Sequence, residues 1–305
     1  MSRVAVVITT YNHARYLDAA IRSVQEQTVQ PDEIIVVDDG STDGPEDAVA
    51  SWPEVRLIRQ DNAGLATARN TGWHAATSEH VIFLDADDRL LPGAIELGLQ
   101  RLGASEDAAF SYGSYVTVDG RSGERRAVAL RPAVEGFASF LRANVIGMHA
   151  TVMYRRARLV DVGGFHPGLP ACEDYELYLR LASRYPVTFG PEVLAEYWLH
   201  DQNMSRDSAM MLRAALDVLH RYEEEARLRS LLPEYRQGVR TWKRHYAVVW
   251  WHSLRRSLRV RPKDRSLVRQ ASVLVALAPV TMTLTPCRLL GERLRAAPSL
   301  FRPVR

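Results

Sequence analysis

The first hundred residues alternate between two hydrophobic periods. Four runs rich in β-branched and aliphatic side chains are typical of strands buried in a sheet. These runs are residues 4–9 (VAVVIT), 33–38 (EIIVVD), 55–59 (VRLIR) and 80–84 (HVIFL). Between them, residues 14–27 and 64–76 place apolar side chains at helical spacing. Alternating strands and helices with short links predict an α/β fold, with a mainly parallel sheet flanked by helices.

The rest of the chain is less regular and then becomes helical. Residues 174–183 have a helical pattern, and two long helices are expected over residues 209–232 and 235–259. Further strands are expected at residues 109–118, 150–155, 187–189 and 194–199. We therefore expect one domain over residues 1–205 and a helical, basic C-terminal extension over residues 206–305.

Polar residues stand where the expected strands end, and ligands of open α/β sheets bind beyond the carboxyl ends of the strands. A D-x-D sequence at such an end can direct two carboxylates into one cleft, where oxygen ligands suit Mg²⁺. A solvated acidic turn is the alternative. The residues concerned are Thr9, Thr10, Tyr11 and Asn12 after the first strand, Asp38 and Asp39 after the second, and Asp85, Asp87 and Asp88 after the fourth.

The turns after the first two strands favour binding of a nucleobase or ribose and disfavour binding of a dinucleotide. A carboxylate in Asp38-Asp39-Gly40-Ser41 can accept hydrogen bonds from a nucleobase or a ribose, and Gly40 permits a tight turn. Ordinary helix capping explains Ser41 but not two adjacent acids. No glycine follows the first strand, so the G-x-G-x-x-G sequence of dinucleotide-binding oxidoreductases is absent there.

Four motifs in order resemble those of family 2 glycosyltransferases of the GT-A fold. The resemblance extends over about two thirds of the chain, from Val4 to Ser205, and each motif stands at an expected strand or helix end. The motifs are Thr9-Thr10-Tyr11-Asn12, Asp38-Asp39-Gly40-Ser41-Thr42-Asp43, Ala68-Arg69-Asn70-Thr71-Gly72 and Phe83-Leu84-Asp85-Ala86-Asp87-Asp88.

The resemblance implies roles for individual residues in a nucleotide-sugar site. Asp38 would contact the uracil with Tyr11 stacking nearby, and Arg69 would approach the diphosphate. Asp85 would touch the ribose or the metal, and Asp87 would bind Mn²⁺ or Mg²⁺. The donor-binding residues implied are Thr9, Tyr11, Asn12, Asp38, Asp39, Arg69, Asp85 and Ala86.

Two later segments also resemble the family. Glu173-Asp174 resembles the E-D motif before a helix, where Asp174 would be the general base; a carboxylate in reach of a hydroxyl can remove its proton. Helix-terminus stabilisation is the alternative. His200 stands in a segment like Y-R-x-H-x-x-N-x-S and would complete the metal site, although Trp198 replaces the common arginine. His149 could line the acceptor site or be a core histidine, and Gly163-Gly164-Phe165 is expected to support the acceptor loop.

Composition and charge narrow the class of protein. The chain has 305 residues, 47% hydrophobic and 25% charged, with two cysteines far apart, which favours a folded protein in a reducing compartment. The net charge is +3, but 15 Lys and Arg against 2 Asp and Glu lie between Arg240 and Arg305. An acidic body with a basic tail is not typical of nucleic-acid binding.

The basic tail suits an anionic membrane surface instead. Trp242, Tyr246, Trp250 and Trp251 stand just before the Lys and Arg residues between Arg255 and Arg269, as in interfacial anchors. Residues 271–287 carry no charge, are short for a membrane span, and could equally form a helical hairpin packed on the body. No secretory signal is expected, so we predict a cytoplasmic protein, with peripheral membrane contact as an option.

The function predicted is therefore inverting transfer of a sugar from a nucleotide-sugar, with uridine as the expected base, to a hydroxyl of a glycan, lipid-linked or small-molecule acceptor. A sugar-phosphate nucleotidyltransferase is a second possibility, but the loop at residues 9–12 lacks glycines and basic residues for a triphosphate. A third is an inactive, membrane-associated scaffold that binds glycans or nucleotide-sugars. Intact Asp38, Asp85, Asp87 and Asp174 disfavour the scaffold.

Overall fold

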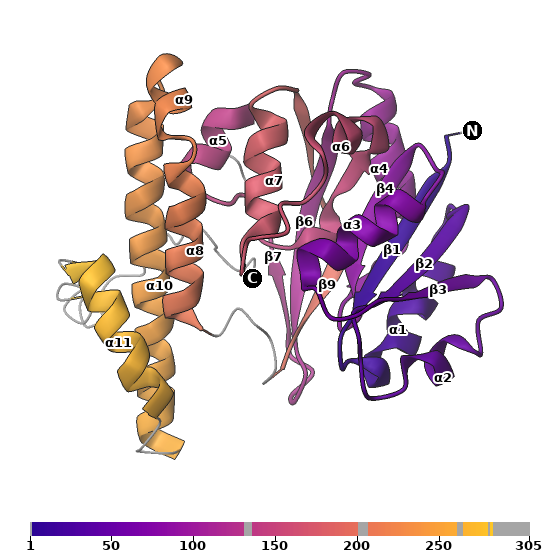
Figure 1. Cartoon of the computed structure of the whole chain (residues 1–305), viewed down its shortest axis with the longest axis horizontal. Helices are drawn as coiled ribbons and strands as arrows, with labels where there is room; N and C mark the ends of the chain where they lie inside the picture. The colour runs from indigo at the N-terminus through magenta and orange to yellow at the C-terminus, as the bar shows by residue number, and fades with distance from the viewer. Residues whose placement is uncertain (1, 131–135, 201–206, 261–264, 280, 283–305) are drawn as a thin grey trace.

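The N-terminal half forms the parallel part of a mixed sheet (Figure 1). The computed structural model describes residues 2–130, 136–200, 207–260, 265–279, 281 and 282, and the side chains of 256–260 and 265–268 are not described. Every residue of the central strand is buried, as its continuous apolar run predicts. The elements are β1 (Val4–Thr10), α1 (Ala14–Gln25), β2 (Glu33–Asp38), α2 (Pro45–Val49), β3 (Val55–Arg59), α3 (Leu65–Ala75) and β4 (His80–Asp85).

Parallel pairing brings the ends of these strands together. The order β3-β2-β1-β4 is parallel throughout, and the register sets Thr10 beside Asp38 and Thr9 beside Asp85. Helix α3 lies close to β1 and β2 because Gly72 has no side chain; a Cβ there would stand 2.2 Å from a methyl of Val7. The predicted boundaries of this half hold to within two residues.

The second half of the sheet is mixed rather than parallel. Within the described residues the full order is β3-β2-β1-β4-β8-β6-β9-β5, with β7 paired to β6. Only β6 and β9 are parallel here; β8 runs antiparallel to both β4 and β6. The elements are β5 (Arg89–Leu90), α4 (Ala94–Gly103), β6 (Phe110–Asp119), β7 (Arg125–Val128), α5 (Gly136–Arg142), η1 (His149–Thr151), β8 (Met153–Arg155), α6 (Arg156–Val162), α7 (Glu173–Ala182) and β9 (Val187–Leu199).

Two strand predictions were wrong in detail. The strands expected at 187–189 and 194–199 are one strand, β9. Gly190 and Pro191 interrupt the apolar pattern, but the pairing with β6 continues past them through a register shift between Tyr112 and Ser114, and proline is tolerated at such bulges. The strand expected from residue 150 begins only at Met153, because His149–Thr151 form a 3₁₀ turn.

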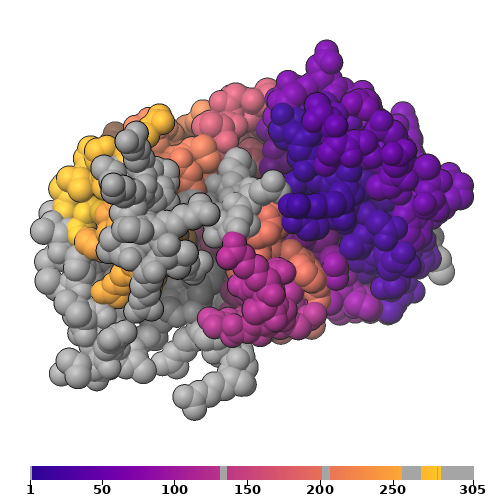
Figure 2. Space-filling model, turned by 90° about the horizontal axis from the view of Figure 1, so that it is seen from below, coloured from indigo at the N-terminus to yellow at the C-terminus, as the bar shows by residue number. Residues whose placement is uncertain are grey.

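The C-terminal extension is helical, as predicted, but its first helix is broken. It consists of α8 (Ser208–His220), α9 (Glu223–Leu228), α10 (Leu232–Val260) and α11 (Arg265–Leu277). Three acidic residues in the first turn of α9 favour a new helix start, and Ser230 in the left-handed region (φ 59°) follows its end. Figures 1 and 2 place these helices and the N-terminal half at opposite ends of the molecule.

The aromatic residues of α10 pack inward instead of forming a membrane anchor. Trp242, Tyr246 and Trp250 are buried, and Trp242 lies against Tyr175 of α7 with ring centroids 5.3 Å apart. Helix α11 packs on α8 and α10 and buries Leu274, which favours the packed hairpin for this part of the uncharged stretch. No described helix has the length and apolar character to cross a bilayer. Location and the domain boundary near residue 205 stay predictions.

Candidate active site

The ends of β1 and β4 meet as the strand pattern predicted. The Thr9 hydroxyl donates to Asp85 Oδ1 at 3.1 Å, and the Ala86 backbone N–H donates to the Thr9 carbonyl at 3.0 Å. Ala86 is buried, whereas the Asp85 side chain keeps one third of its surface exposed. The turn after β4 therefore begins from a fixed point, with Asp85 at the edge of the site.

The turn after β2 uses its two acids to order neighbouring loops. Asp38 is fully buried; its Oδ1 accepts from the Ser41 backbone N–H at 2.9 Å, and its Oδ2 lies 3.3 Å from Nε of Arg59. Asp39 accepts from the backbone N–H groups of Ala63 and Gly64, both at 2.9 Å. These bonds account for two adjacent acids, and the Asp38 carboxylate has no exposed surface for the uracil contact that the resemblance implied.

Tyr11 and Asn12 have different roles: the ring of Tyr11 is exposed, and the side-chain amide of Asn12 is used to hold two loops together. The Tyr11 side chain is half exposed, so its ring is open to a base. Asn12 has a left-handed backbone (φ 55°), and its Oδ1 accepts from the Thr42 backbone N–H at 2.9 Å. Its own N–H donates to Ser41 Oγ at 2.9 Å. Asn12 thus ties the loop after β1 to the loop after β2.

Arg69 links α7 to the turn after β4. This turn, residues 85–88, carries three aspartates and is called the acidic turn below. Its Nη2 donates to Asp85 at 2.9 Å and its Nη1 to Glu173 at 2.7 Å, and the side chain is 2% exposed. Burial alone would lower its pKa, but the carboxylates of Asp85 and Glu173 raise the pKa of Arg69, so the cation persists. In this arrangement the guanidinium positions two carboxylates, and the implied approach of Arg69 to a diphosphate stays a prediction.

The E-D motif forms the first turn of α7, behind a strained residue. Cys172, which caps the helix, has φ 61°, a conformation that favours glycine. Asp174 is partly buried and its Oδ1 accepts from the Tyr175 N–H at 2.6 Å. Burial and the neighbouring Glu173 raise the pKa of Asp174 to about 7, against the opposing effect of Arg69. A carboxylate with such a pKa can exchange a proton near neutral pH.

The segment Gly163-Gly164-Phe165 is bonded to α3, which agrees with its expected role in supporting a loop. The Asn70 side chain donates to the Phe165 carbonyl at 2.8 Å and accepts from the Phe165 N–H at 2.9 Å. The Phe165 ring lies 5.5 Å from the Arg69 guanidinium. Gly164 (φ 67°) allows the close approach, since a Cβ there would stand 2.5 Å from Oδ1 of Asn70.

His149 belongs to the core. It is buried, with Nδ1 at 2.7 Å from the Tyr178 hydroxyl and its ring stacked on that of Tyr178. Burial holds the pKa of His149 well below its ordinary value, with a smaller contribution from Arg69. Of the two interpretations of His149, the core histidine fits these contacts.

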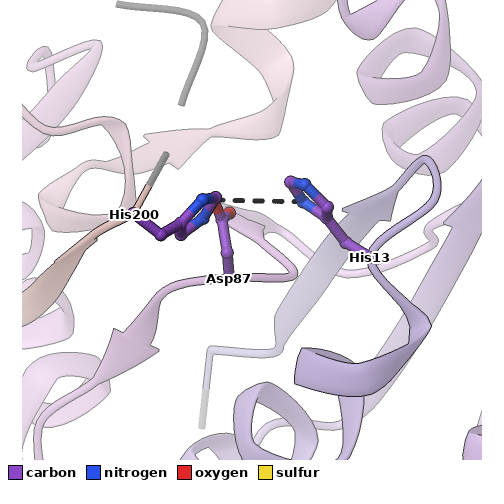
Figure 3. Close-up of side chains that lie close together, drawn as sticks. All are labelled: His13, Asp87 and His200. Atoms are coloured by element: carbon purple, nitrogen blue, oxygen red, sulfur yellow. Dashed lines mark hydrogen bonds and ion pairs between the residues drawn. The ribbon is translucent and has the colours of Figure 1, made fainter. Parts of the chain in front are cut away.

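The last part of the site joins the acidic turn to the end of β9 (Figure 3). His200 Nε2 lies 2.8 Å from Asp87 Oδ2, as the metal-site prediction required. His13, which that prediction missed, places Nδ1 3.9 Å from the same oxygen. Its signal in the sequence was its place directly after the Thr9–Asn12 motif. Asp88 is buried and accepts from the Trp198 N–H at 2.9 Å, which fixes β9 against the turn.

Comparison with known proteins then identifies the family. The family described as glycosyl transferase family 2 matches residues 5–163, which is more than half of the chain. The chain belongs to glycosyltransferase family 2. One relative, Escherichia coli chondroitin synthase, is 27% identical over 206 residues, covering 66% of this chain and 30% of that protein. The chain spans about a third of the length of this and several other curated relatives.

Solved structures place the family 2 chain in the GT-A fold, as the motifs implied. Staphylococcus aureus TarS 1–349 in complex with UDP-GlcNAc superposes with a TM-score of 0.59 at 16% identity, covering 94% of this chain and 92% of that one. The mannosyltransferase PcManGT from Pyrobaculum calidifontis, in complex with GDP-Man and Mn²⁺, gives 0.60 at 20% identity, covering 92% and 87%. At these identities the likeness shows the fold.

The donor set of the family 2 site suits a divalent cation. Asp87 and His200 supply one carboxylate oxygen and one imidazole nitrogen, and the ligand atoms of His13, Asp87 and His200 all lie within 4.8 Å of one another. Two atoms that bind one ion at about 2.0–2.2 Å are at most about 4.4 Å apart. The Asp87 contacts at 2.8 Å and 3.9 Å are inside this limit. Asp87 therefore fits the predicted metal together with His200, and its distance to His13 is inside the same limit.

Proposed function

We propose that this protein transfers a sugar from a nucleotide-sugar, with UDP as the expected carrier, to a hydroxyl of a glycan or lipid-linked acceptor, and that it inverts the anomeric centre. One observation carries the proposal: the raised pKa of Asp174 and the acidic turn belong to one connected site. Glu173, beside Asp174, and Asp85, at the start of the turn, bind the same guanidinium of Arg69.

Asp174 is the proposed general base. A carboxylate with a pKa of about 7 takes the acceptor proton while the hydroxyl oxygen forms its bond to the anomeric carbon. The electron pair of the old glycosidic bond leaves with the diphosphate on the opposite face, so the configuration inverts. Glu173 stays bound to Arg69 and leaves Asp174 as the carboxylate free to accept a proton.

The donor is proposed to lie beyond the carboxyl ends of β1, β2 and β4. The half-exposed ring of Tyr11 is the surface on which a base would stack, and Asp85 keeps one third of its side chain exposed at the end of β4. Asp87 and His200 would hold a divalent cation, whose chemistry is to neutralise charge on the departing diphosphate. UDP-GlcNAc in TarS and GDP-Man with Mn²⁺ in PcManGT support a nucleotide-sugar donor of this kind.

Thermal unfolding with a panel of nucleotides tests the donor site. Each ligand would be added with and without Mn²⁺: first UDP, GDP, dTDP and ADP, and then nucleotide-sugars that carry the best-binding base. A ligand at 100 times its Kd stabilises the folded state by about 2.7 kcal/mol, so one base should raise the midpoint and Mn²⁺ should increase the effect. The Asp87→Asn variant should lose the Mn²⁺-dependent part only.

A product assay separates the enzyme from the inactive scaffold. The donor in this assay is a nucleotide-sugar that carries the best-binding base. Wild type should release the nucleoside diphosphate from it and Asp174→Asn should not, while both proteins bind the donor alike. Donor binding without release in wild type, for acceptors of the glycan and lipid-linked classes, would favour the scaffold. Turnover retained in the variant would refute the role of Asp174.

A further inference from the structure

His13 is directed toward the acidic turn by the loop that precedes it. The left-handed backbone of Asn12 turns the chain between β1 and α1, and bonds to the loop after β2 hold this conformation. His13 occupies the N-cap position of α1, yet its side chain makes no capping hydrogen bond. It is 23% exposed and belongs to no part of the core. The imidazole therefore neither caps the helix nor belongs to the hydrophobic core.

Among the described residues, the carboxylate opposite His13 has imidazoles as its side-chain partners. In the acidic turn, Asp85 is paired with Arg69 and Asp88 accepts the Trp198 N–H. The contacts of Asp87 to side chains are instead two imidazoles, His200 and His13. Figure 3 shows both rings directed at the Asp87 carboxylate from opposite sides.

A tyrosine supports the imidazole of His200. The Tyr16 ring, one turn along α1 from His13, stacks on His200 with centroids 5.2 Å apart and planes 18° apart. His13 meets His200 edge to face at 5.5 Å. The ring contacts among His13, Tyr16 and His200 thus hold the two imidazoles next to the Asp87 carboxylate.

We propose that His13 is a third protein ligand, which gives a site of two imidazoles and one carboxylate that binds a divalent transition metal without the help of a nucleotide. This inference rests on the proposed function, because the metal serves the same diphosphate. Imidazole nitrogen suits Zn²⁺ and other later transition metals, and carboxylate oxygen suits Mn²⁺ as well, whereas Mg²⁺ prefers oxygen alone and is usually held by carboxylates together with substrate phosphates. The site therefore selects transition metals over Mg²⁺ and leaves further coordination positions for diphosphate oxygens.

Cobalt binding to the nucleotide-free, full-length protein tests the proposal. Co²⁺ reports nitrogen ligands through its visible absorption, and calorimetry gives the stoichiometry and Kd. Wild type should bind one Co²⁺, and millimolar Mg²⁺ should not displace it. His13→Asn should weaken binding by about tenfold or more, and His13→Ser should do the same. Asn and Ser are good N-caps, so both variants keep the start of α1, which circular dichroism checks.

A matched control is His220→Asn, which removes an exposed histidine of α8 and should bind Co²⁺ like wild type. Wild-type affinity in both His13 variants, or equal competition by Mg²⁺, would overturn the proposal. Repeating the titration with UDP separates this failure from that of the proposed function. If the His13 variants match wild type with and without UDP, the metal is bound but His13 is not a ligand. If wild type binds no metal even with UDP, metal dependence itself is refuted.

Discussion

Replacing Asp174 with Asn should make the protein more stable at alkaline pH while it removes turnover. The pKa of Asp174 is raised from 3.8 to about 7, first by burial and then by Glu173. In the unfolded chain an aspartate has a pKa of about 3.9. Between these two values the folded state keeps a proton that the unfolded state has released, so the free energy of unfolding falls as the pH rises through this window.

The size of the effect follows from that difference in pKa. Each pH unit across the window is worth about 1.4 kcal/mol, so the full loss in wild type is about 4 kcal/mol above pH 7. Asn has the shape of the protonated acid and stays neutral at every pH. The variant should therefore match wild type near pH 4 and exceed it by up to about 4 kcal/mol at pH 8.5.

Urea unfolding of both proteins at pH 4.5, 6, 7 and 8.5 measures this difference. Asp217→Asn, which removes an exposed carboxylate of α8, controls for the change in net charge. In the same preparations, kcat/KM of wild type should rise with pH to a plateau with a midpoint near 7, and Asp174→Asn should lose about 10²–10⁴-fold in rate. A stability difference that is the same at every pH would refute the reasoning from burial.

Three further changes probe the support of the site, each by urea unfolding. Arg69→Met should lower the free energy of unfolding by about 3–5 kcal/mol, because the buried Glu173 and the partly exposed Asp85 lose their shared cation. Gly164→Ala should cost about 1–3 kcal/mol more than Gly163→Ala, because both have a left-handed backbone but only the first meets an atom, Asn70 Oδ1, at 2.5 Å. His149→Phe should lose less stability than wild type when the pH is lowered from 7 to 5. In wild type the folded state resists protonation of His149, while the unfolded chain binds a proton at this residue below about pH 6.5.

The N-terminal half of the fold could be predicted because its strands are buried on both faces. The runs at residues 4–9 and 33–38 have continuous apolar centres, and their boundaries agree closely with β1 and β2. The second half carries no such signal, since β8 and β5 are two or three residues long and pair with distant strands. Gly190 and Pro191 suggested a break in β9 that the pairing with β6 overrides.

The sequence predicted which residues of the candidate site lie close together, but the partners of its charged residues were not predictable. Strand ends place Thr9 beside Asp85, and the resemblance placed His200 with Asp87. Whether an acid faces a ligand or a backbone N–H depends on loop conformation, so Asp38 appeared open and is buried. The aromatic residues of α10 have a helical spacing that fits a membrane face and a protein core equally well; contact with α7 decides for the core.

The division of the sheet has a consequence for recombination between family members. The strands of the proposed donor side, β1 to β4, end at Asp85, the short β5 ends at Leu90, and β6 begins at Phe110, so a crossover in the loop after α4 cuts no strand. Such a hybrid would take its nucleotide preference from one parent and its acceptor from the other. Several contacts cross the junction, and two of them join charged side chains of the site: Arg69 needs a glutamate at the start of α7, and Asp87 needs a histidine where β9 ends. Parents that share both are the ones whose halves can be exchanged.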